Sequence, residues 1–305
     1  MTTVAIVIVC YKSIPETLDC LKSLNTLSLP QIQATVFVID NSADNTLEKR
    51  LPKLKFNLHY FKSLLNLGFA EGVNEGIKKA GINHFDYFLL LNSDTIVSKD
   101  LLINLVSLIK ANPNYGLVSP KIYFAPGKEY HKDRYQKEDL GKVIWYAGGR
   151  IDWNNVYCSH VGVDQVDDGQ FDRTKPTDFA TGCCLLIPSQ IISKVGLLDT
   201  KYFLYFEDVD YSMRIRKAGF EIIYAPQSFL HHKNASSSGS PGSSLHIYYQ
   251  TRNRLYFGFK YASFKTKIHL FKEAVKILFS DDKIRKNAVS DFFINKMGRG
   301  TFHQN

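Results

Sequence analysis

The segment Tyr87-Phe-Leu-Leu-Leu-Asn-Ser-Asp94 is an apolar run that ends in an amide, a hydroxyl and a carboxylate. A short, continuous apolar run is typical of a strand that is buried on both faces of a sheet. We therefore predict a central strand over residues 87–91, with Asn92 and Asp94 at its carboxyl end.

Three further apolar runs precede polar turns and predict strands over Val4–Cys10, Thr35–Ile39 and Leu58–Phe61. Between these runs, apolar residues recur at helical spacing, as at Leu101 and Leu105. Strands that alternate with helices form right-handed crossovers, so we expect an α/β fold with a Rossmann-like, mostly parallel sheet. In such sheets, ligands bind at the carboxyl ends of the strands.

Polar residues follow each of the predicted strands. They are Tyr11 and Lys12, Asp40 and Asn41, Asn66–Gly76, and Asn92–Asp94. Taken one at a time, Asn, Asp and Gly at a strand end are explained by turn formation. Because four such groups would meet at one edge of the sheet, we interpret them as a ligand site.

The run Asn66-Leu-Gly-Phe-Ala-Glu-Gly-Val-Asn-Glu-Gly76 leads into a predicted helix. Free N–H groups at a helix start favour an anionic ligand. The glycines are spaced by four, which matches neither a dinucleotide-binding fingerprint nor a Walker loop. The run therefore indicates an anion site of another kind.

A carboxylate at the end of a buried strand, such as Asp94, suits a divalent cation. Mg²⁺ and Mn²⁺ are commonly held by few protein oxygens together with substrate phosphates and water. The alternative is that Asp94 caps the helix that starts near Asp100, but Ser98 stands closer to that helix.

The densest group of acids lies in Tyr202-Phe-Leu-Tyr-Phe-Glu-Asp-Val-Asp-Tyr-Ser-Met-Arg214, before a glycine at 219. We expect a helix that Asp208 caps, with Asp210 and Arg214 forming an i, i+4 ion pair. Glu207 and Asp208 would then lie beside aromatic rings, an environment that raises a carboxyl pKa towards the range of a general base. A capped surface helix without catalytic function is the alternative.

Composition excludes several classes of protein. The chain has 305 residues, 45% of them hydrophobic and 22% charged, as in an ordinary globular protein. No apolar stretch approaches the roughly 18 residues of a membrane-spanning helix, and the start lacks the layout of a signal peptide. Five cysteines without framework spacing predict no disulfide scaffold and fit a reducing cytoplasm.

The positive charge lies in the tail. Residues 240–305 carry 12 Lys and Arg and four Asp and Glu, a net charge of +8 out of +9 for the whole chain. Basic and aromatic residues alternate there as in an amphipathic helix, which either lies in an anionic membrane surface or packs on its own domain. Nucleic-acid binding is disfavoured because no recognised motif accompanies the charge.

Several motifs together resemble the family-two glycosyltransferases of the GT-A fold, and within them the bacterial polysaccharide rhamnosyltransferases. The motifs are Val-Ile-Val-x-Tyr11, Asp40-Asn41, Asn66-x-Gly-x-Ala-x-Gly-x-Asn-x-Gly76, Leu-Asn-Ser-Asp94, Ala147-Gly-Gly-x-Ile-Asp152, Ala180-Thr-Gly182, Glu-Asp-Val-Asp210 and the segment 226–232. The likeness covers about residues 3–260. Its most specific part is the Glu-Asp-Val-Asp block with Arg214, Gly219 and the later His232.

The resemblance implies a role for individual residues. Asp208 would be the base that deprotonates the acceptor hydroxyl, and Glu207 would position the acceptor. Asp94 and His232 would hold Mg²⁺ or Mn²⁺. The nucleotide sugar would contact Tyr11, Asp40, Asn66, Gly68, Asn74, Asn92 and Asp94. Asn92 replaces an Asp of the family's metal-binding motif, which leaves one carboxylate fewer.

The resemblance also implies an organisation and a reaction. We expect a GT-A domain over residues 1–235, a mobile Ser/Gly loop over 236–244 and a basic helical region over 245–305. The enzyme would transfer a sugar with inversion to a hydroxyl of a growing, lipid-linked surface glycan, at the inner face of the cell membrane. L-Rhamnose from dTDP-rhamnose is the preferred donor; UDP-glucose, UDP-galactose and UDP-galactofuranose remain open, as do the linkage and the oligomeric state.

Two other classes of function fit the sequence less well. A sugar nucleotidyltransferase needs a Gly-rich loop after the first strand, where this chain has Cys10-Tyr-Lys-Ser13. A non-catalytic membrane or glycan-binding protein would have no use for Asp94, Glu207, Asp208 and His232 together.

Overall fold

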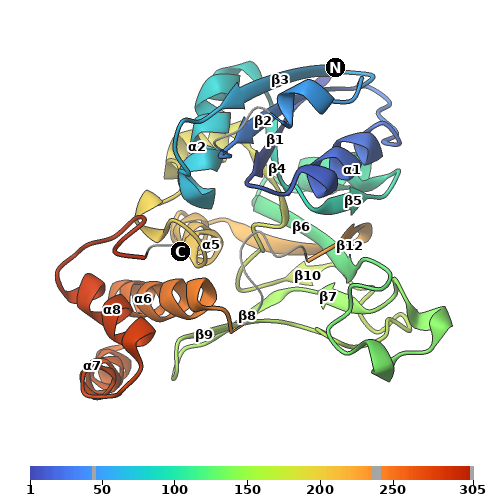
Figure 1. The fold of residues 1–305 in the computed structure, drawn as a ribbon. Coiled ribbons are helices and arrows are strands. Elements are labelled where there is room, and N and C mark those ends of the chain that lie inside the picture. Colours follow the sequence, from blue (N-terminus) through green and yellow to red (C-terminus); the bar gives the residue numbers. More distant parts are fainter. Residues whose placement is uncertain (43–45, 235–241, 303–305) are drawn as a thin grey trace.

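The computed structural model describes residues 1–42, 46–234 and 242–302. Within them, a curved and mostly parallel sheet carries helices on both faces, and three helices at the C-terminal end pack beside it (Figure 1). The predicted α/β class is confirmed.

The four strands that the sequence predicts are present in the predicted order, and eight further strands follow them among the described residues. Their bounds are β1 (Thr2–Cys10), α1 (Ile14–Leu24), β2 (Ile32–Asp40), β3 (Asn57–Lys62), α2 (Gly68–Ala80), β4 (Tyr87–Asn92), β5 (Thr95–Val97), α3 (Leu101–Ala111), β6 (Tyr115–Phe124), β7 (Ile144–Tyr146), β8 (Gly149–Asp152), β9 (Tyr157–His160), β10 (Lys175–Pro176), β11 (Cys184–Pro188), α4 (Ser189–Val195), α5 (Glu207–Lys217), β12 (Glu221–His232), α6 (Ser244–Tyr261), α7 (Phe264–Leu278) and α8 (Lys283–Phe293). The four predicted strands are β1 to β4, each at least as long as predicted.

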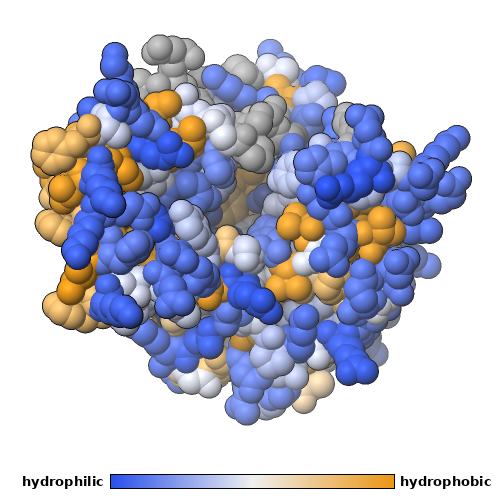
Figure 2. Space-filling view, turned by 90° about the horizontal axis from the view of Figure 1, so that it is seen from below, coloured by the Kyte–Doolittle hydropathy of each residue, from blue (hydrophilic) through white to orange (hydrophobic). Residues whose placement is uncertain are grey.

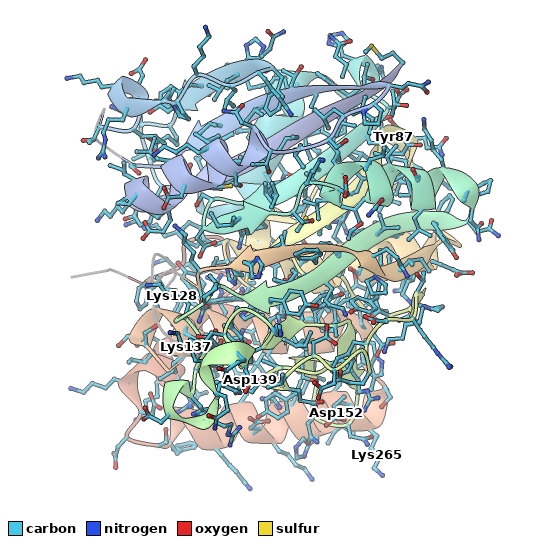
Figure 3. All side chains as sticks on the ribbon, turned by 90° about the vertical axis from the view of Figure 1, so that its right-hand side faces the viewer. Tyr87, Lys128, Lys137, Asp139, Asp152 and Lys265 are labelled. Atoms are coloured by element: carbon cyan, nitrogen blue, oxygen red, sulfur yellow. The ribbon has the colours of Figure 1, made fainter. Side chains whose placement is uncertain are left out.

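The main sheet has the order β10-β12-β6-β11-β4-β1-β2-β3. Strands β1 to β4 are parallel, and β6 pairs parallel with β12, whereas β11 lies antiparallel between β4 and β6. Tyr87 at the start of β4 and Lys128 just after β6 lie at opposite ends of the sheet (Figure 3). Because β1 pairs parallel with both β2 and β4, the carboxyl ends of these three strands share one edge of the sheet.

Side chains of β1 alternate between two cores. Val4, Ile6 and Ile8 pack with the helices α1 and α3. Ala5 and Val7 face the other way and pack with α2, α4 and α5. A parallel strand that is covered on both faces must be apolar on both, which explains the continuous apolar run in the sequence.

The spacing of the glycines in α2 reflects close packing. Gly72 and Gly76 lie on the face of α2 that contacts β1, and a Cβ atom on Gly76 would lie 2.3 Å from Cγ1 of Val7. Gly68 begins the helix with a φ of +77°, and a Cβ atom there would lie 2.5 Å from the carbonyl oxygen of Phe203. The repeat of four therefore lets the helix approach the sheet, while only Gly68 reaches the ligand edge.

The C-terminal region divides into a buried helix and two outer ones. Helix α6 buries Tyr248, Tyr249, Arg252, Asn253 and Phe257 against the rest of the protein. Helices α7 and α8 pack on α6 and on each other. The predicted boundaries of the three regions stay a prediction, and most of the Ser/Gly segment 236–244 lies outside the described residues.

The surface seen from below is mainly hydrophilic (Figure 2). Apolar residues gather at its left edge, on the side where α7 lies in Figure 1. Among the described residues, no helix combines the length and the apolar character needed to cross a membrane.

Candidate active site

A cleft of about 600 Å³ opens at the carboxyl ends of β1 and β4 and reaches the start of α5. Eight of the predicted site residues line it: Tyr11, Asn66, Gly68, Asn92, Asp94, Glu207, Asp208 and His232. Residues from five separate stretches of the sequence thus converge on one cleft.

Asp94 and His232 are brought together by strand pairing. Thr95, directly after Asp94, pairs with His232 in the antiparallel ladder between β5 and β12. The backbone N–H of Lys233 also donates to the carbonyl oxygen of Asp94 at 2.9 Å. As a result, Nε2 of His232 lies 3.0 Å from Oδ1 of Asp94, and both residues are buried.

The donor atoms of Asp94 and His232 fit a divalent cation that shares its coordination with a substrate. A carboxylate oxygen and an imidazole nitrogen are both ligands for Mn²⁺, and the carboxylate suits Mg²⁺. Nδ1 of His232 is buried and has no hydrogen-bond partner within the described part of the chain. The described residues hold no cluster of three or more His, Cys, Asp or Glu side chains suited to a metal. Phosphate and water oxygens would therefore have to complete the coordination.

Glu207 and Asp208 form the acidic side of the cleft. Oδ2 of Asp208 accepts the N–H of Gly182 and Oδ1 accepts the N–H of Val209, each at 2.8 Å. The predicted capping role of Asp208 is wrong, because α5 has Phe206 at its N-cap and no side-chain cap. The carboxylate is instead fixed across the cleft, towards the loop that contains Gly182.

Burial perturbs both carboxyl groups. Burial, and then the charge of Asp208, raises the pKa of Glu207 well above its usual range. One of the oxygens of Glu207, Oε2, is buried without a hydrogen-bond partner among the described residues. Burial also raises the pKa of Asp208, although the N–H groups of Gly182 and Val209 act to lower it. A raised pKa suits a group that must accept a proton near neutral pH.

The turn before α5 has an unusual backbone. Phe203, Tyr205 and Phe206 have φ values of 56°, 68° and 72°, a region that bulky residues rarely adopt. Nδ2 of Asn253, on α6, lies 2.8 to 2.9 Å from the carbonyl oxygens of Tyr202, Leu204 and Tyr205. Helix α6 therefore holds the turn that presents Glu207 to the cleft.

Asn253 was not identified from the sequence. It lies in the basic, aromatic stretch of the tail, whose pattern indicates a helix and nothing more. Only the fold shows that this buried amide faces a turn some fifty residues earlier in the chain.

Two predicted site residues do not line the cleft. Asp40 is buried at the end of β2, where it accepts hydrogen bonds from the hydroxyl of Tyr60 and the N–H of Ser42, both at 2.8 Å. Asn74 bonds the backbone of Leu198 through both its amide oxygen and its amide nitrogen, at 3.0 and 2.9 Å. Next to Asp40, Asn41 does line the cleft, and it donates to the carbonyl oxygen of Gly68.

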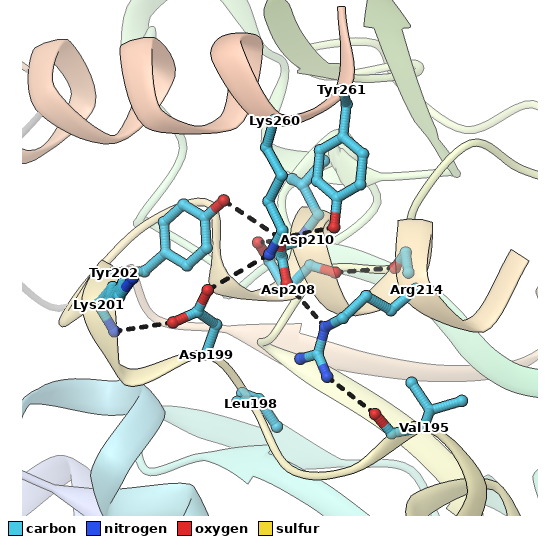
Figure 4. A network of polar contacts seen from close by, with 12 residues as sticks. Val195, Leu198, Asp199, Lys201, Tyr202, Asp208, Asp210, Arg214, Lys260 and Tyr261 are labelled. Atoms are coloured by element: carbon cyan, nitrogen blue, oxygen red, sulfur yellow. Dashed lines mark hydrogen bonds and ion pairs between the residues drawn. The ribbon is translucent and has the colours of Figure 1, made fainter. Parts of the chain in front are cut away.

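Asp210 is the centre of a buried polar network (Figure 4). Its Oδ1 accepts from Nζ of Lys260 at 2.7 Å and from the hydroxyls of Tyr261 and Tyr202 at 2.8 and 3.2 Å. Its Oδ2 accepts from Nε of Arg214 at 2.8 Å, which confirms the predicted i, i+4 pair. The network joins α5, α6 and the turn at 202, so it fixes the helix that begins with the acidic pair.

The family comparison agrees with this geometry. The family model described as "Glycosyltransferase like family 2" matches residues 2–258. The chain belongs to this family. The GT-A fold that the sequence predicts is thereby confirmed for this glycosyltransferase.

Relatives of the glycosyltransferase include a hexosyltransferase and a rhamnosyltransferase. It is 25% identical to the low-salt glycan biosynthesis hexosyltransferase Agl10 of Haloferax volcanii, over 72% of this chain and 66% of that one. It is also 25% identical to the N-acetylglucosaminyl-diphospho-decaprenol L-rhamnosyltransferase of Mycobacterium tuberculosis, over 71% and 72%. The chain thus spans about two thirds of the length of these relatives.

Solved structures share the fold of this glycosyltransferase at low sequence identity. GalNAc-T7, crystallised with UDP, GalNAc and Mn²⁺, has a TM-score of 0.68 at 16% identity and covers 96% of this chain and 55% of its own. The mannosyltransferase PcManGT of Pyrobaculum calidifontis, with GDP-Man and Mn²⁺, has a TM-score of 0.54 at 15% identity, over 98% and 76%.

Glu207→Gln should stabilise the protein near neutral pH, with a gain that shrinks as the pH falls. A carboxyl whose pKa is raised by folding contributes full stability below its unfolded pKa and loses it as the pH rises through the folded pKa. Glutamine does not titrate, so the difference in Tm between the variant and the wild type should grow from about pH 4 to about pH 8. A difference that stays constant with pH would contradict a raised pKa, and exposed Glu138→Gln serves as the control.

Asp210→Asn should destabilise the fold more than it slows transfer. It leaves Lys260 and Arg214 facing a neutral group, and breaking a buried charge pair typically costs about 3 kcal/mol or more. Thermal unfolding measures the loss, with Glu273→Gln as the matched control, because the Glu273 pair with Arg254 is less buried. If the two variants lose the same stability, the network around Asp210 contributes no more to the free energy of unfolding than the less buried pair of Glu273 and Arg254.

Proposed function

We propose that this glycosyltransferase transfers a sugar, with inversion, from a nucleotide donor to a hydroxyl group of a growing lipid-linked surface glycan. The observation that carries the proposal is that two different pairs line the same cleft. Asp94 and His232 line it, and so do Glu207 and Asp208. The first pair suits a leaving diphosphate with its cation, and the second suits a nucleophilic hydroxyl.

The donor would occupy the edge formed by β1, β4 and the start of α2. Tyr11, Asn66, Gly68 and Asn92 lie there and are proposed to contact the nucleotide sugar. Asp94 and His232 would hold Mg²⁺ or Mn²⁺, which would offset the charge that develops on the diphosphate. The Mn²⁺ present with GalNAc-T7 and PcManGT supports a divalent ion without selecting between the two metals.

Asp208 is the proposed base. It would take the proton from the acceptor hydroxyl as that oxygen bonds to the anomeric carbon, while the bond from that carbon to the diphosphate oxygen breaks. One displacement of this kind inverts the anomeric centre and needs no protein nucleophile. The N–H groups of Gly182 and Val209 fix the carboxylate for this step. Glu207, held protonated by burial and by the charge of Asp208, would donate a hydrogen bond that positions the acceptor.

Asp40 and Asn74 lie outside the lining of the cleft. The nucleotide contact predicted for Asp40 stays a prediction, because its carboxylate already accepts two hydrogen bonds inside the protein. Asn74 serves the site through Leu198 and α2 rather than by lining the cleft. Asn41 lines the cleft, so it is better placed than Asp40 to contact the nucleotide.

The proposed donor sugar is L-rhamnose from dTDP-rhamnose. It is supported by the likeness to the mycobacterial rhamnosyltransferase, whose name also specifies a lipid-linked acceptor. UDP-glucose, UDP-galactose and UDP-galactofuranose are the competing donors, since other relatives are hexosyl- and N-acetylglucosaminyl-transferring enzymes. Thermal-shift titration with dTDP and UDP, each with Mn²⁺, would separate the two groups of donors.

Asp208→Asn should reduce transfer by about 10²- to 10⁴-fold, the usual contribution of a general base. The side chain keeps its size but has one acceptor oxygen where the carboxylate has two, so one of the N–H groups of Gly182 and Val209 loses its partner. The Tm should therefore fall modestly, while donor affinity should change little. The measurement is sugar transfer to an acceptor, together with calorimetric donor titration and thermal unfolding of the same variant.

A transfer rate within a few-fold of wild type for Asp208→Asn would place the base elsewhere, with Glu207 as the next candidate. Glu207→Gln is therefore the paired variant. Glutamine can still donate the hydrogen bond proposed for protonated Glu207, so transfer and the KM for the acceptor should change little, whereas a Glu207 that acted as the base would be lost with this substitution. Loss of donor binding in either variant would assign the pair to the donor instead.

Asp94→Ala should abolish metal-dependent nucleotide binding, while Asn92→Ala should weaken it less, because a carboxylate supplies the charge that a hard divalent ion prefers. Calorimetric titration of the nucleoside diphosphate, with Mn²⁺ and with a chelator, measures both. Equal affinity of wild type and Asp94→Ala in Mn²⁺ would remove Asp94 from the metal site.

A further inference from the structure

Helix α7 exposes an apolar stripe to solvent. Phe264, Ile268, Phe271, Val275 and Phe279 recur at intervals of four, three, four and four residues, which places them along one side of the helix. Phe264 and Phe279, at its two ends, are 80% and 87% exposed. The opposite side of the helix, with Thr266, Leu270 and Ala274, is buried against the protein. The stripe is therefore not part of the core.

A row of cations runs beside this stripe. Lys265, Lys272 and Lys276 are all exposed and lie on adjacent positions of the helix surface. The one acid of α7, Glu273, faces inwards and binds the guanidinium of Arg254 at 2.7 and 2.9 Å. Along the chain, the first exposed acid after α7 is Asp281, which lies beyond the end of the helix.

The apolar surface continues onto the end of α8. The rings of Phe271 and Phe293 are in edge contact, with centroids 6.0 Å apart. Phe293 and the adjacent Ile294 are 43% and 69% exposed. In Figure 1, α7 and α8 lie on the side of the molecule where Figure 2 shows apolar residues at the left edge. Lys265 lies at the lower margin of the molecule, away from the main sheet (Figure 3).

We propose that the exposed side of α7, with the end of α8, docks on a membrane surface that contains anionic lipids. A helix with phenylalanine along one line and lysine along the next can insert its rings at the acyl boundary while its ammonium groups contact headgroups. The cytoplasmic leaflet carries such anionic lipids. Charge complementarity selects this occupant, because the exposed side of α7 carries only positive charge.

Docking in this way would also orient the cleft. Leu245, His246 and Gln250 of α6 line it, and α6 packs directly on α7 and α8. The cleft would be held at a fixed position relative to the bilayer, as a lipid-linked acceptor requires. That consequence rests on the proposed function, whereas membrane binding itself does not.

The test is co-sedimentation of the full chain with phosphatidylcholine vesicles, with and without phosphatidylglycerol. The wild type should bind only the anionic vesicles, and binding should decline with salt, since the Debye length is about 8 Å at physiological ionic strength. Phe264→Ser with Phe279→Ser should lower the partition coefficient at least tenfold, because both rings are already exposed and their loss leaves the fold intact. Thermal unfolding checks that last point.

Charge reversal supplies the matched control. Lys272→Glu with Lys276→Glu should lower binding at least tenfold, as each cation near the surface contributes about fivefold. Lys49→Glu with Lys53→Glu makes the same change in net charge on exposed residues of a distant loop and should leave most of the binding intact. Truncation is a poorer test, because Asp291 of α8 bonds Tyr248 of α6.

Three outcomes would overturn the proposal. The first is that the wild type fails to bind anionic vesicles. The second is that reversal at 49 and 53 weakens binding as much as reversal at 272 and 276. The third is a dimer in light scattering that the Phe264/Phe279 variant converts to monomer, with vesicle binding unchanged, which would make this face a contact between copies of the chain. None of these readouts measures catalysis, so failure of the membrane proposal is distinguishable from failure of the proposed function.

Discussion

The fully buried carboxylate of Asp210 joins helix α5 to helix α6 of the C-terminal region. A charge taken out of water is tolerable only where hydrogen-bond donors replace the water. Asp210 finds four, and they come from its own helix, from the turn before it and from α6. Because this one carboxylate needs these partners, helix α5, which begins with Glu207 and Asp208, is tied to the C-terminal region.

The site is built from two kinds of support. On the proposed donor side, strand pairing fixes the backbone on both sides of Asp94 and at His232. The two side chains therefore meet through the sheet itself. On the proposed acceptor side, three residues of one turn have positive φ values, and the turn would not keep this shape alone. The buried amide of Asn253 holds it. The proposed base therefore depends on tertiary contacts, whereas the proposed metal pair depends on the sheet.

The same division explains what the sequence could predict. The strands β1 to β4 and the position of Asp94 follow from local apolar runs, and the Asp210–Arg214 pair follows from helical spacing. Asn253, Lys260 and the bonds of Asp40 to Tyr60 join residues far apart in the sequence, so no local pattern reports them. The capping role given to Asp208 failed because the left-handed Phe206 turns the chain into α5 in another way.

The way α6 holds the turn at residues 202–206 bears on how the C-terminal helices can be exchanged between related enzymes. Asn253, Lys260 and Tyr261 hold the turn and the helix that carry Glu207 and Asp208, although by position they belong to the tail. Arg252 also donates to the carbonyl oxygens of Lys201 and Gly298. A chimaera that receives a foreign tail from residue 244 onwards would therefore lose the contacts that hold this turn. Only the part of the chain after Tyr261, with α7 and α8, could be exchanged, and the surfaces of these helices that pack on α6 would still have to match it.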